Sequence, residues 1–461
     1  MNRSISRLFL VLLLLFGVLV GATSWWTVFG AQKLRTNVNN HRILLAEQRI
    51  KRGTITADDG AVLARARPIG KNAWGRRYPT GPLFAQPVGC NSLDRGRSGL
   101  ESSYNDPLTG RRTEIVGVFD SIFQPRNVGD DLRTTLSSKG QKAAMDGLAG
   151  RPQQGAVVAL ELKTGAVKVL AAKPSYDPNT AQCGANLNLA TQGRYPPGST
   201  MKVVTAAAAL DTGKFQPSST LNGKSPQTIS GAPLNNFNNE QFGDIDLTTA
   251  LTNSVNTVWA QVAVKLGKQT MADYMDKFGF YTDPPMDYPD GEMVPSGEYQ
   301  RGKLLPDTSG LIDVGRMGIG QDKLLVTPLQ MAEVAQTVGN GGVRMKPRIV
   351  AKVVDTDGRT IATPLGEQAQ RVMSSDSARK LTDMMKQVVK EGTGTAAALK
   401  GVDVAGKTGT AELNLNGLND AWFICFTDKY AVAVVIDHVQ GATGGVVAAP
   451  IAKTVLEALG R

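Results

Sequence analysis

A rigid loop that leads directly into an apolar helix places the strongest constraint on this chain. Residues 196–198, Pro-Pro-Gly, cannot continue a helix and predict a loop. From Ser199 the sequence runs through Lys202 and four alanines to Leu210, and Gly213 is a plausible stop. Because residues i and i+3 share a helix face, Ser199 and Lys202 can meet.

This pairing of serine and lysine suggests nucleophilic chemistry. A lysine in so apolar a helix is either exposed or buried, and burial lowers the pKa of its amine toward neutrality. If its amine is neutral, Lys202 can act as the base that activates the Ser199 hydroxyl as a nucleophile. Ser199 also stands at a helix N-terminus, where free backbone N–H groups can stabilise an oxyanion.

The Ser-x-x-Lys spacing alone does not identify a catalytic serine, because the chain contains it a second time. Ser377 and Lys380 lie in a charged stretch, residues 376–383, which predicts an N-cap and a solvated helix. On spacing alone, the Ser199 pair is as well explained by chance as by catalysis.

Two further short motifs each have a functional and a structural interpretation. Ser254 and Asn256 precede an apolar helix expected over residues 258–266. In the functional interpretation Ser254 relays a proton and Asn256 binds a substrate amide. In the structural interpretation both are N-cap candidates of that helix. Residues 407–410, Lys-Thr-Gly-Thr, are expected on a strand where Gly409 allows a close approach and Lys407, Thr408 and Thr410 receive a carboxylate. The structural alternative is a strand-end glycine with an exposed lysine.

The N-terminus predicts a membrane anchor. Residues 8–31 are uncharged and long enough to span a bilayer, and Arg3 and Arg7 before them place residues 1–7 in the cytoplasm. Trp25 and Trp26 suit the outer interface. The alternative is a cleaved signal peptide. A retained anchor makes the protein single-pass in the cell membrane, with everything beyond residue 31 extracytoplasmic.

Composition narrows the partners and the chemistry. The net charge of +11 favours anionic partners such as membrane surfaces, but no zinc-finger spacing or aromatic-interleaved basic patch points to nucleic acid. Two histidines and three scattered cysteines form no visible metal-ligand cluster, so neither a metal nor a cofactor is expected. His438 is expected to be structural, at a strand end. Cys90 and Cys183 can pair outside the cell, and Cys425 is expected as a buried thiol.

The remaining pattern predicts a two-part α+β chain. Residues 32–150, rich in charge, glycine and proline, form a small pedestal domain with a hairpin turn at Asp59-Gly60. From residue 151 to 461 we expect an antiparallel sheet flanked by helices. Its expected elements are a hairpin over 156–171, a loop over 173–198, helices from 199 through about 275, a loop over 280–310, helices over 327–339, 377–391 and 449–459, and strands over 401–413, 420–427 and 429–439.

The order of the three motifs identifies a family resemblance. Ser-x-x-Lys at 199, Ser-x-Asn at 254 and Lys-Thr-Gly at 407 follow the order shared by penicillin-binding proteins and serine β-lactamases, whereas the other copies at Ser103, Lys163 and Ser377 do not. The chain resembles a class B penicillin-binding protein, and the match includes the anchor, residues 52–55, 99–101, 195–202, 318–320, 327–330 and 421–423. Length and pedestal are similar to the actinobacterial penicillin-binding protein A group. One departure is Ala57-Asp58-Asp59-Gly60, where the family often has Asp-Arg-Asn-Gly. It lies in the pedestal and bears on partner contacts.

The resemblance implies a penicillin-binding, serine β-lactamase-like transpeptidase domain that cross-links peptidoglycan stem peptides during cell-wall synthesis at the septum. Ser199 attacks the D-Ala-D-Ala donor with Lys202 as base, and Ser254 and Lys407 pass a proton to the departing D-alanine. Asn256 binds the backbone of the donor peptide. Thr408 and Thr410 bind its terminal carboxylate, and Gly409 lies beside them. β-Lactams acylate Ser199, and a SEDS-class glycan polymerase and divisome proteins are the implied partners. The alternatives are a D,D-carboxypeptidase, a β-lactamase, a β-lactam sensor and a non-catalytic wall-binding scaffold. A β-lactamase commonly needs a Glu-x-x-x-Asn loop, which Glu292 and Glu298 lack.

Overall fold

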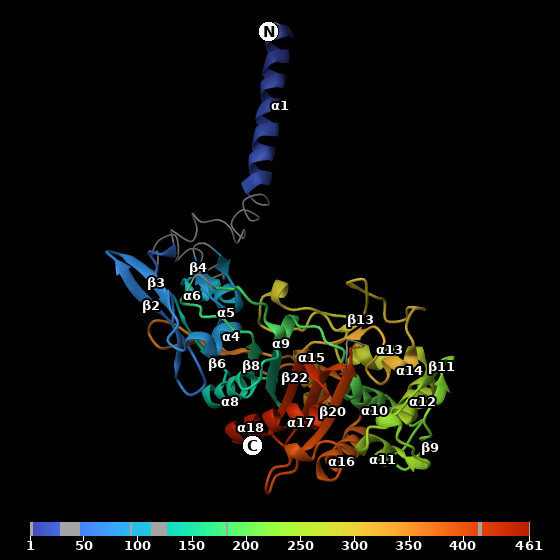
Figure 1. The fold of residues 1–461 in the computed structure, drawn as a ribbon. Coiled ribbons are helices and arrows are strands. Elements are labelled where there is room, and N and C mark those ends of the chain that lie inside the picture. The colour runs from blue at the N-terminus through green and yellow to red at the C-terminus, as the bar shows by residue number, and fades with distance from the viewer. Residues whose placement is uncertain are drawn as a thin grey trace.

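The computed structural model describes residues 3–27, 47–92, 95–111, 127–180, 183–413 and 417–460. Its first helix, α1 (Arg3–Trp25), projects away from the body of the protein (Figure 1). Residues 4–25 have a mean hydropathy of 2.5 with none of the most apolar window buried, so this helix is long and apolar enough to cross a membrane. The structure thus agrees with an N-terminal anchor by length and composition. The end of the predicted span, residues 28–31, lies outside the described residues.

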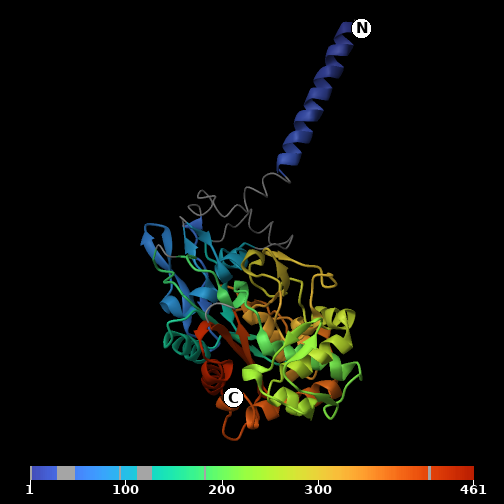
Figure 2. The same cartoon turned by 45° about the vertical axis from the view of Figure 1, so that its right-hand side comes forward.

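A five-stranded antiparallel sheet forms the centre of the protein. Its strand order is β20 (Ala405–Glu412), β21 (Leu418–Phe426), β22 (Tyr430–Gln440), β7 (Gly155–Glu161) and β8 (Val167–Lys173). All five strands were predicted from their apolar runs, and the structure confirms them with ends shifted by a few residues. Figures 1 and 2 show the blue N-terminal strands on one side of this sheet and the green to yellow helices on the other.

The sheet is apolar on both faces because each face supports its own core. Successive side chains of a strand point to opposite faces. Val157, Val434 and Phe423 pack with α8 (Ser138–Ala149) and α18 (Ala449–Ala458). Val158, Val435 and Trp422 join the larger core, which includes α10 (Lys202–Asp211), α15 (Pro328–Gly339) and α16 (Ser375–Lys390).

The helix signals were predicted well where capping residues mark them. Thr327 caps α15, its hydroxyl accepting from the Gln330 N–H at 3.1 Å, with Pro328 as the first helical residue. The predicted cap of α16 was one turn late. Ser374 caps that helix and accepts from the Ser377 N–H, so Ser377 is the third residue of the helix, and buried, rather than its cap.

One region was predicted wrongly. The expectation of helices through residue 275 fails over 220–246, which forms two small hairpins. In these, β9 (Thr220–Asn222) pairs with β12 (Asp244–Asp246), and β10 (Gln227–Ile229) pairs with β11 (Ala232–Leu234). Asparagine, glycine, serine and proline dominate the segment and favour turns over helix.

A second, six-stranded sheet forms most of the pedestal. Its order is β18 (Thr360–Ala362), β17 (Val350–Val354), β6 (Asp131–Thr134), β1 (Ile55–Thr56), β2 (Val62–Gly70) and β3 (Ala73–Arg77). The predicted hairpin turn is present, with Gly60 at φ +85° between β1 and β2. Two strands of this sheet come from a much later segment of the chain than the other four. The predicted boundary at residue 150 is therefore a boundary in the sequence only, because this sheet contains strands from before and after it.

The remaining elements are two longer helices of the core, α12 (Asn256–Leu266) and α13 (Lys268–Lys277), and short segments. The short helices are η2 (Gly81–Phe84), α4 (Ala85–Val88), α5 (Gly99–Ser103), α6 (Asn105–Leu108), α9 (Leu189–Gln192), η3 (Gly198–Met201), η4 (Phe237–Asn239), α11 (Leu247–Thr252), η5 (Asp290–Glu292), α14 (Val314–Met317), η6 (Thr395–Ala397) and α17 (Gly444–Val447). The strands are β4 (Asn91–Ser92), β5 (Gly96–Arg97), β13 (Gly297–Gln300), β14 (Lys303–Leu304), β15 (Leu324–Leu325), β16 (Val343–Met345) and β19 (Gln368–Arg371). The two predicted loops, 173–198 and 280–310, thus contain short elements.

A disulfide joins the pedestal to the central region. Cys90, which follows α4, is bonded to Cys183 in the long segment after β8. The pairing that the sequence allowed is therefore present. Cys425 is fully buried on β21 as a free thiol, as predicted.

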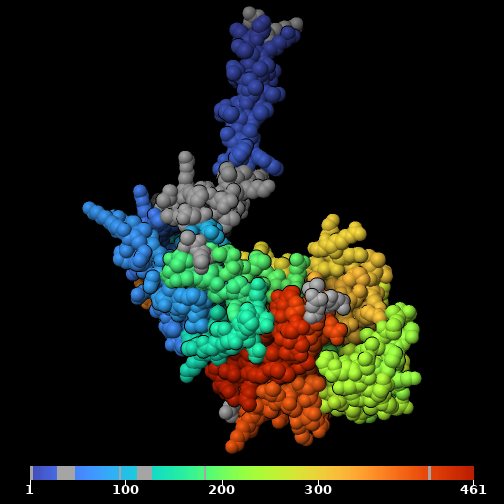
Figure 3. All heavy atoms as spheres, viewed as in Figure 1, coloured from blue at the N-terminus to red at the C-terminus, as the bar shows by residue number. Residues whose placement is uncertain are grey.

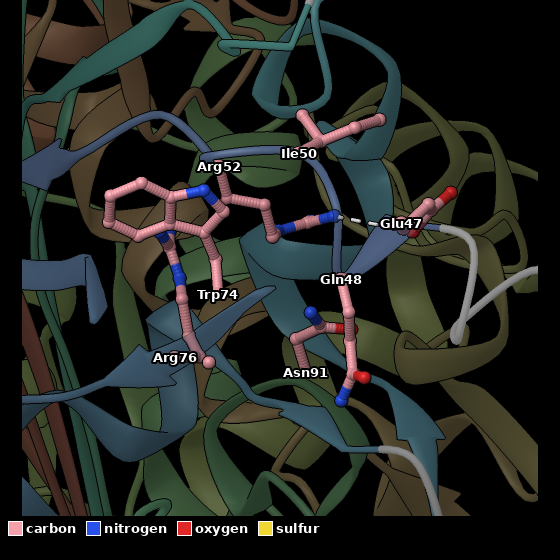
Figure 4. Close-up of a pocket in the computed structure, with 8 residues that line it drawn as sticks. Glu47, Gln48, Ile50, Arg52, Trp74, Arg76 and Asn91 are labelled. Carbon is pink, nitrogen blue, oxygen red and sulfur yellow. Dashed lines mark ion pairs between the residues drawn. The ribbon is translucent and has the colours of Figure 1, made fainter. Parts of the chain in front are cut away.

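A buried charge cluster holds the pedestal together. Glu101 on α5 has no exposed surface and accepts from Arg52 Nε at 3.0 Å and from Arg76 Nε. Burial raises the pKa of the Glu101 carboxyl, but Arg76 and Arg52 outweigh it and hold the pKa below its usual value. Figure 4 shows Arg52 and Arg76 beside Trp74, with Arg52 paired to Glu47 at 3.7 Å.

Replacing Glu101 with glutamine should therefore destabilise the protein strongly. The buried Arg76 guanidinium would lose its carboxylate partner and Arg52 the nearer of its two, which costs about 3–5 kcal/mol of unfolding free energy. Urea unfolding of the full chain at neutral pH measures it. Because the folded-state pKa of Glu101 is lowered, its contribution is present above the pKa of an unfolded glutamate and disappears as pH falls below that value.

Glu367→Gln is the matched control, because Glu367 forms an exposed pair with Lys346 and its loss should leave the unfolding transition unchanged. Equal transitions for both variants would contradict a stabilising role of the Glu101 cluster.

Candidate active site

Ser199 lies in a tight turn that places it over Lys202. The 3₁₀ turn η3 contains Ser199 and leads directly into α10, and the Lys202 N–H donates to the Ser199 carbonyl oxygen. In such a turn the side chains at i and i+3 lie one above the other. The predicted loop and helix are present, although the first turn is tighter than an α-helix, and the two residues lie three positions apart on one face of it.

Glycines let this turn press against the edge of the central sheet. Gly198 has φ +52°, and a Cβ on it would come within 2.8 Å of the Thr410 carbonyl oxygen. Its N–H donates to the Gly320 carbonyl oxygen at 2.9 Å. The Trp422 indole donates to the Pro196 carbonyl oxygen at 3.0 Å. The loop is thereby fixed between β20, β21 and the segment after α14.

The amine of Lys202 is fully buried and faces the second motif. It contacts the Ser254 carbonyl oxygen at 2.6 Å, Asn256 Oδ1 at 2.7 Å and Ser254 Oγ at 3.2 Å. Burial, and then the charge of Lys407, lower the pKa of Lys202 well below its usual value. The site thus favours the neutral amine that general base catalysis needs.

Ser254 lies in the sharp connection between α11 and α12. Its φ of +58° is unusual for a residue with a side chain, and the turn directs its hydroxyl between two lysines. Lys407 Nζ donates to Ser254 Oγ at 2.8 Å. Asn256 is the first residue of α12, and its amide nitrogen also donates to the Asn235 carbonyl oxygen at 3.1 Å. Neither residue is the helix cap, which is Val255.

The third motif lies on β20, opposite Ser254. Lys407 is fully buried, and burial lowers its pKa to about 7. Gly409 lets the strand approach the serine loop, since a Cβ there would be 2.7 Å from the Pro197 carbonyl oxygen. The Thr408 hydroxyl is 2.6 Å from the Thr393 hydroxyl. Thr410 is half-buried and pairs with Ala421 on β21.

The three motifs therefore converge, whereas their other copies do not. Within the described residues, no carboxylate hydrogen-bonds to Lys202, Ser254 or Lys407, so the site is rich in amines and short of counter-charge. Such a site favours a ligand that brings its own carboxylate. Ser103 ends α5, Lys163 is exposed in a turn and Lys380 pairs with Asp376 at 2.8 Å.

Two residues at the site were not predicted. Thr393 contacts Thr408, and Asn235 accepts from Asn256. Thr393 lies in a Gly-Thr-Gly turn after α16, and Asn235 lies in the segment wrongly expected to be helical. Such turns carry no periodic signal, so only the folded structure places them.

One cluster elsewhere has the composition of a metal site. Asp420, Asp437 and His438 place ligand atoms within 4.8 Å of one another. His438 Nδ1 contacts Asp437, and the His438 N–H donates to Asp420 at 3.2 Å. Burial, and then a hydrogen bond with Asp437, raise the pKa of Asp420 to about 8. These groups satisfy one another, so we assign no ion to them. His438 lies at a strand irregularity, as a structural residue.

Comparison with known proteins gives a consistent result along the chain. The penicillin binding protein transpeptidase domain family matches residues 155–457, and the penicillin binding protein A dimerisation domain matches residues 52–124. The peptidoglycan D,D-transpeptidase PbpA of Mycolicibacterium smegmatis is 33% identical, over 99% of both chains. Penicillin-binding protein 3 of Bacillus subtilis is 30% identical over 76% of this chain and 54% of its own length. A structure of penicillin-binding protein A from M. tuberculosis, a ceftriaxone acyl-enzyme complex, superposes with a TM-score of 0.80 at 31% identity, covering 90% of this chain and 99% of the other.

Proposed function

The chain belongs to the class B penicillin-binding proteins, and from this membership we propose that it is a serine-type D,D-transpeptidase that cross-links peptidoglycan stem peptides. The single observation that supports the assignment most is the contact of Lys202, Ser254 and Lys407 beside Ser199. Three motifs far apart in sequence meet there in a site with two buried amines. The chemistry below follows from that arrangement.

In the first step Ser199 becomes acylated. Its Oγ attacks the carbonyl carbon of the D-Ala-D-Ala peptide bond while its proton passes to the neutral amine of Lys202. The new C–O bond forms as the carbonyl π electrons move to oxygen. The backbone N–H groups of Ser199, on the turn, and of Thr410, on β20, stabilise that oxyanion.

In the second half of this step D-alanine departs. The C–N bond breaks, and the leaving nitrogen takes a proton through Ser254 Oγ, which lies within 3.2 Å of Lys202 Nζ and 2.8 Å of Lys407 Nζ. The amine of a neighbouring stem peptide then attacks the ester, which forms the cross-link and releases Ser199. The acceptor amine gives up a proton through Ser254 Oγ to Lys202, and Lys202 returns a proton to Ser199 Oγ.

Substrate recognition uses the rest of the site. The Thr408 and Thr410 hydroxyls bind the donor carboxylate, whose charge the amines of the site favour. Thr408 is kept in place by Thr393. Asn256 binds the donor peptide backbone with the amide hydrogen that Asn235 does not use. Gly409 leaves room for the peptide beside β20. A β-lactam presents the same carboxylate and acyl group and therefore acylates Ser199.

Within the part of the chain that the structure describes, neither Glu292 nor Glu298 is placed to act as a carboxylate base for hydrolysis of this ester. Glu292 accepts from the Gly99 N–H at 3.0 Å and Glu298 from the Tyr281 hydroxyl at 2.7 Å. Neither glutamate contacts the residues of the site. A long-lived β-lactam adduct distinguishes a transpeptidase of this kind from a β-lactamase.

The test follows that adduct directly. The full chain in detergent is treated with a fluorescent penicillin, and its intact mass is recorded over hours. We expect one added penicillin per chain, a lifetime far beyond the labelling time, and peptide mapping that locates it at Ser199. An adduct that hydrolyses within seconds would overturn the transpeptidase assignment in favour of a β-lactamase.

We also propose the cellular setting. With α1 retained as a single-pass anchor and its basic start in the cytoplasm, the catalytic region is extracytoplasmic, where peptidoglycan lies. Septal cell-wall synthesis with a SEDS-class polymerase and divisome proteins is the setting that the family resemblance supports. Fluorescent fusions of the full chain in dividing cells test the septal location.

A further inference from the structure

The hairpin formed by β2 and β3 stands out from the pedestal, where β3 is the edge of the six-stranded sheet (Figures 1 and 3). Alternation along the strands gives this hairpin two different faces. The inner face carries Trp74 and Arg76 and covers the buried Arg–Glu cluster (Figure 4). The outer face carries Arg65, Arg67 and Arg77, with Ile69 lying over Gly75.

The outer face concentrates uncompensated positive charge. Residues 61–77 include five basic residues and no acidic ones. Arg65 and Arg77 are directly opposite each other across the strands, an arrangement that destabilises a sheet. In the part of the chain that the structure describes, Arg65, Arg67, Lys71 and Arg77 form no ion pair, although Arg76 on the same hairpin does. An anionic partner would relieve this repulsion.

The tip of the hairpin is apolar. Ile69 is 49% exposed, Pro68 beside it is exposed, and Lys71 follows at the turn. Trp74 is half-buried behind the tip, with Lys51 Nζ 5.7 Å from its ring centroid. Apolar side chains surrounded by cations are typical of segments that lie in the interface of an anionic membrane.

We propose that this outer face, Arg65, Arg67, Ile69 and Arg77 with Lys71 at the tip, binds the anionic headgroups of the bilayer that holds α1, with Ile69 entering the interface. Residues 26–46 separate α1 from the pedestal, and a chain of that length reaches at most about 75 Å. The hairpin is thus within reach of the membrane. The inference rests on α1 being a retained anchor and is independent of the chemistry at Ser199.

Headgroup contact would give the pedestal a second attachment. Each arginine near an anionic surface contributes favourably to binding, and several together hold the hairpin there at moderate ionic strength.

The cysteine content of the chain allows a direct test. Two cysteines form the disulfide and the third is fully buried, so a Gly70→Cys variant has one reactive thiol, on the outer face because Gly70 pairs with Ala73. The full chain, labelled there with an environment-sensitive fluorophore, is reconstituted in vesicles of phosphatidylcholine with or without phosphatidylglycerol. Quenching by doxyl-labelled lipid reports contact. We expect strong quenching only with phosphatidylglycerol, decreasing near 1 M salt, where the Debye length is about 3 Å.

Charge variants make the test specific. Arg65→Gln, Arg67→Gln and Arg77→Gln combined should reduce hairpin occupancy of the anionic surface at least about tenfold. The matched control removes three exposed lysines elsewhere, Lys224→Gln, Lys265→Gln and Lys390→Gln, and should change nothing. An unaltered penicillin acylation rate shows that each variant is folded.

Three results would overturn the proposal. These are quenching that is equal in both lipids, quenching that persists in the triple arginine variant, and a label that responds only when peptidoglycan fragments or an acidic protein are added. The last would assign the face to that partner instead. Because penicillin acylation is measured in parallel, a failure here is distinct from a failure of the transpeptidase assignment.

Discussion

Ser199→Ala will abolish the covalent penicillin adduct, and Ser377→Ala will leave it unchanged. Both serines start a Ser-x-x-Lys sequence, but only Ser199 lies beside a buried lysine. Lys380 instead pairs with Asp376 on an exposed helix. Without the Ser199 hydroxyl the assigned nucleophile is gone, and Ser254 keeps its place between the two lysine amines, so intact mass should show unmodified protein however long the exposure.

The comparison of the two variants, with their thermal unfolding midpoints, distinguishes loss of the nucleophile from loss of the fold. A Ser199→Ala protein with the same thermal unfolding midpoint as the wild type and no adduct places the nucleophile at Ser199. Retention of the adduct in this variant, or its loss in Ser377→Ala, would show that the nucleophile has been misassigned.

Lys202→Met should lower the second-order rate of penicillin acylation by about 10²- to 10⁴-fold, the range for loss of a general base. Methionine fills a similar volume but takes no proton. It also leaves the Ser254 carbonyl and Asn256 Oδ1 without their donor, so the unfolding midpoint is measured alongside. Stopped-flow kinetics with a chromogenic cephalosporin gives the rate. Lys380→Met is the matched control and should acylate normally.

The pH profile of this rate separates the two lysines. Lys202 acts as a base only when neutral, and its pKa is lowered, so the rate should rise with pH and do so at lower pH than an ordinary lysine would give. Lys407 has a pKa of about 7 and contributes when protonated, so the rate should fall above that pH. Lys407→Met removes the falling limb. It also removes the charge that lowers the Lys202 pKa, so the rising limb should move to higher pH. An unmoved rising limb would contradict this coupling.

The active site was largely predictable from the sequence because its chemistry depends on short spacings. Lys202 is three positions after Ser199, and Asn256 is two positions after Ser254, whatever the rest of the chain does. Their order along the chain then distinguished them from their duplicates. The contacts between motifs could not be predicted, because no local sequence pattern indicates that Lys407 Nζ lies 2.8 Å from Ser254 Oγ.

The fold was predictable where a periodic pattern persists. The five long strands and α15, α16 and α18 carry buried runs, caps or both. Strands of two to five residues carry neither, so β9 to β12 were taken as helix and β17 with β18 were not expected in the pedestal. The disulfide was one option among three cysteines, because spacing does not determine connectivity.

The six-stranded sheet also restricts how this protein can be recombined during evolution. Strand β6 pairs with β1 on one side and with β17 on the other. A gene fusion that exchanged everything before residue 150 would import a new β6 and leave the old β17 and β18 behind. Unless both sequences matched, the imported strand would expose its hydrogen-bonding edge to other chains. The pedestal and the catalytic segment are therefore inherited together, as one unit of descent.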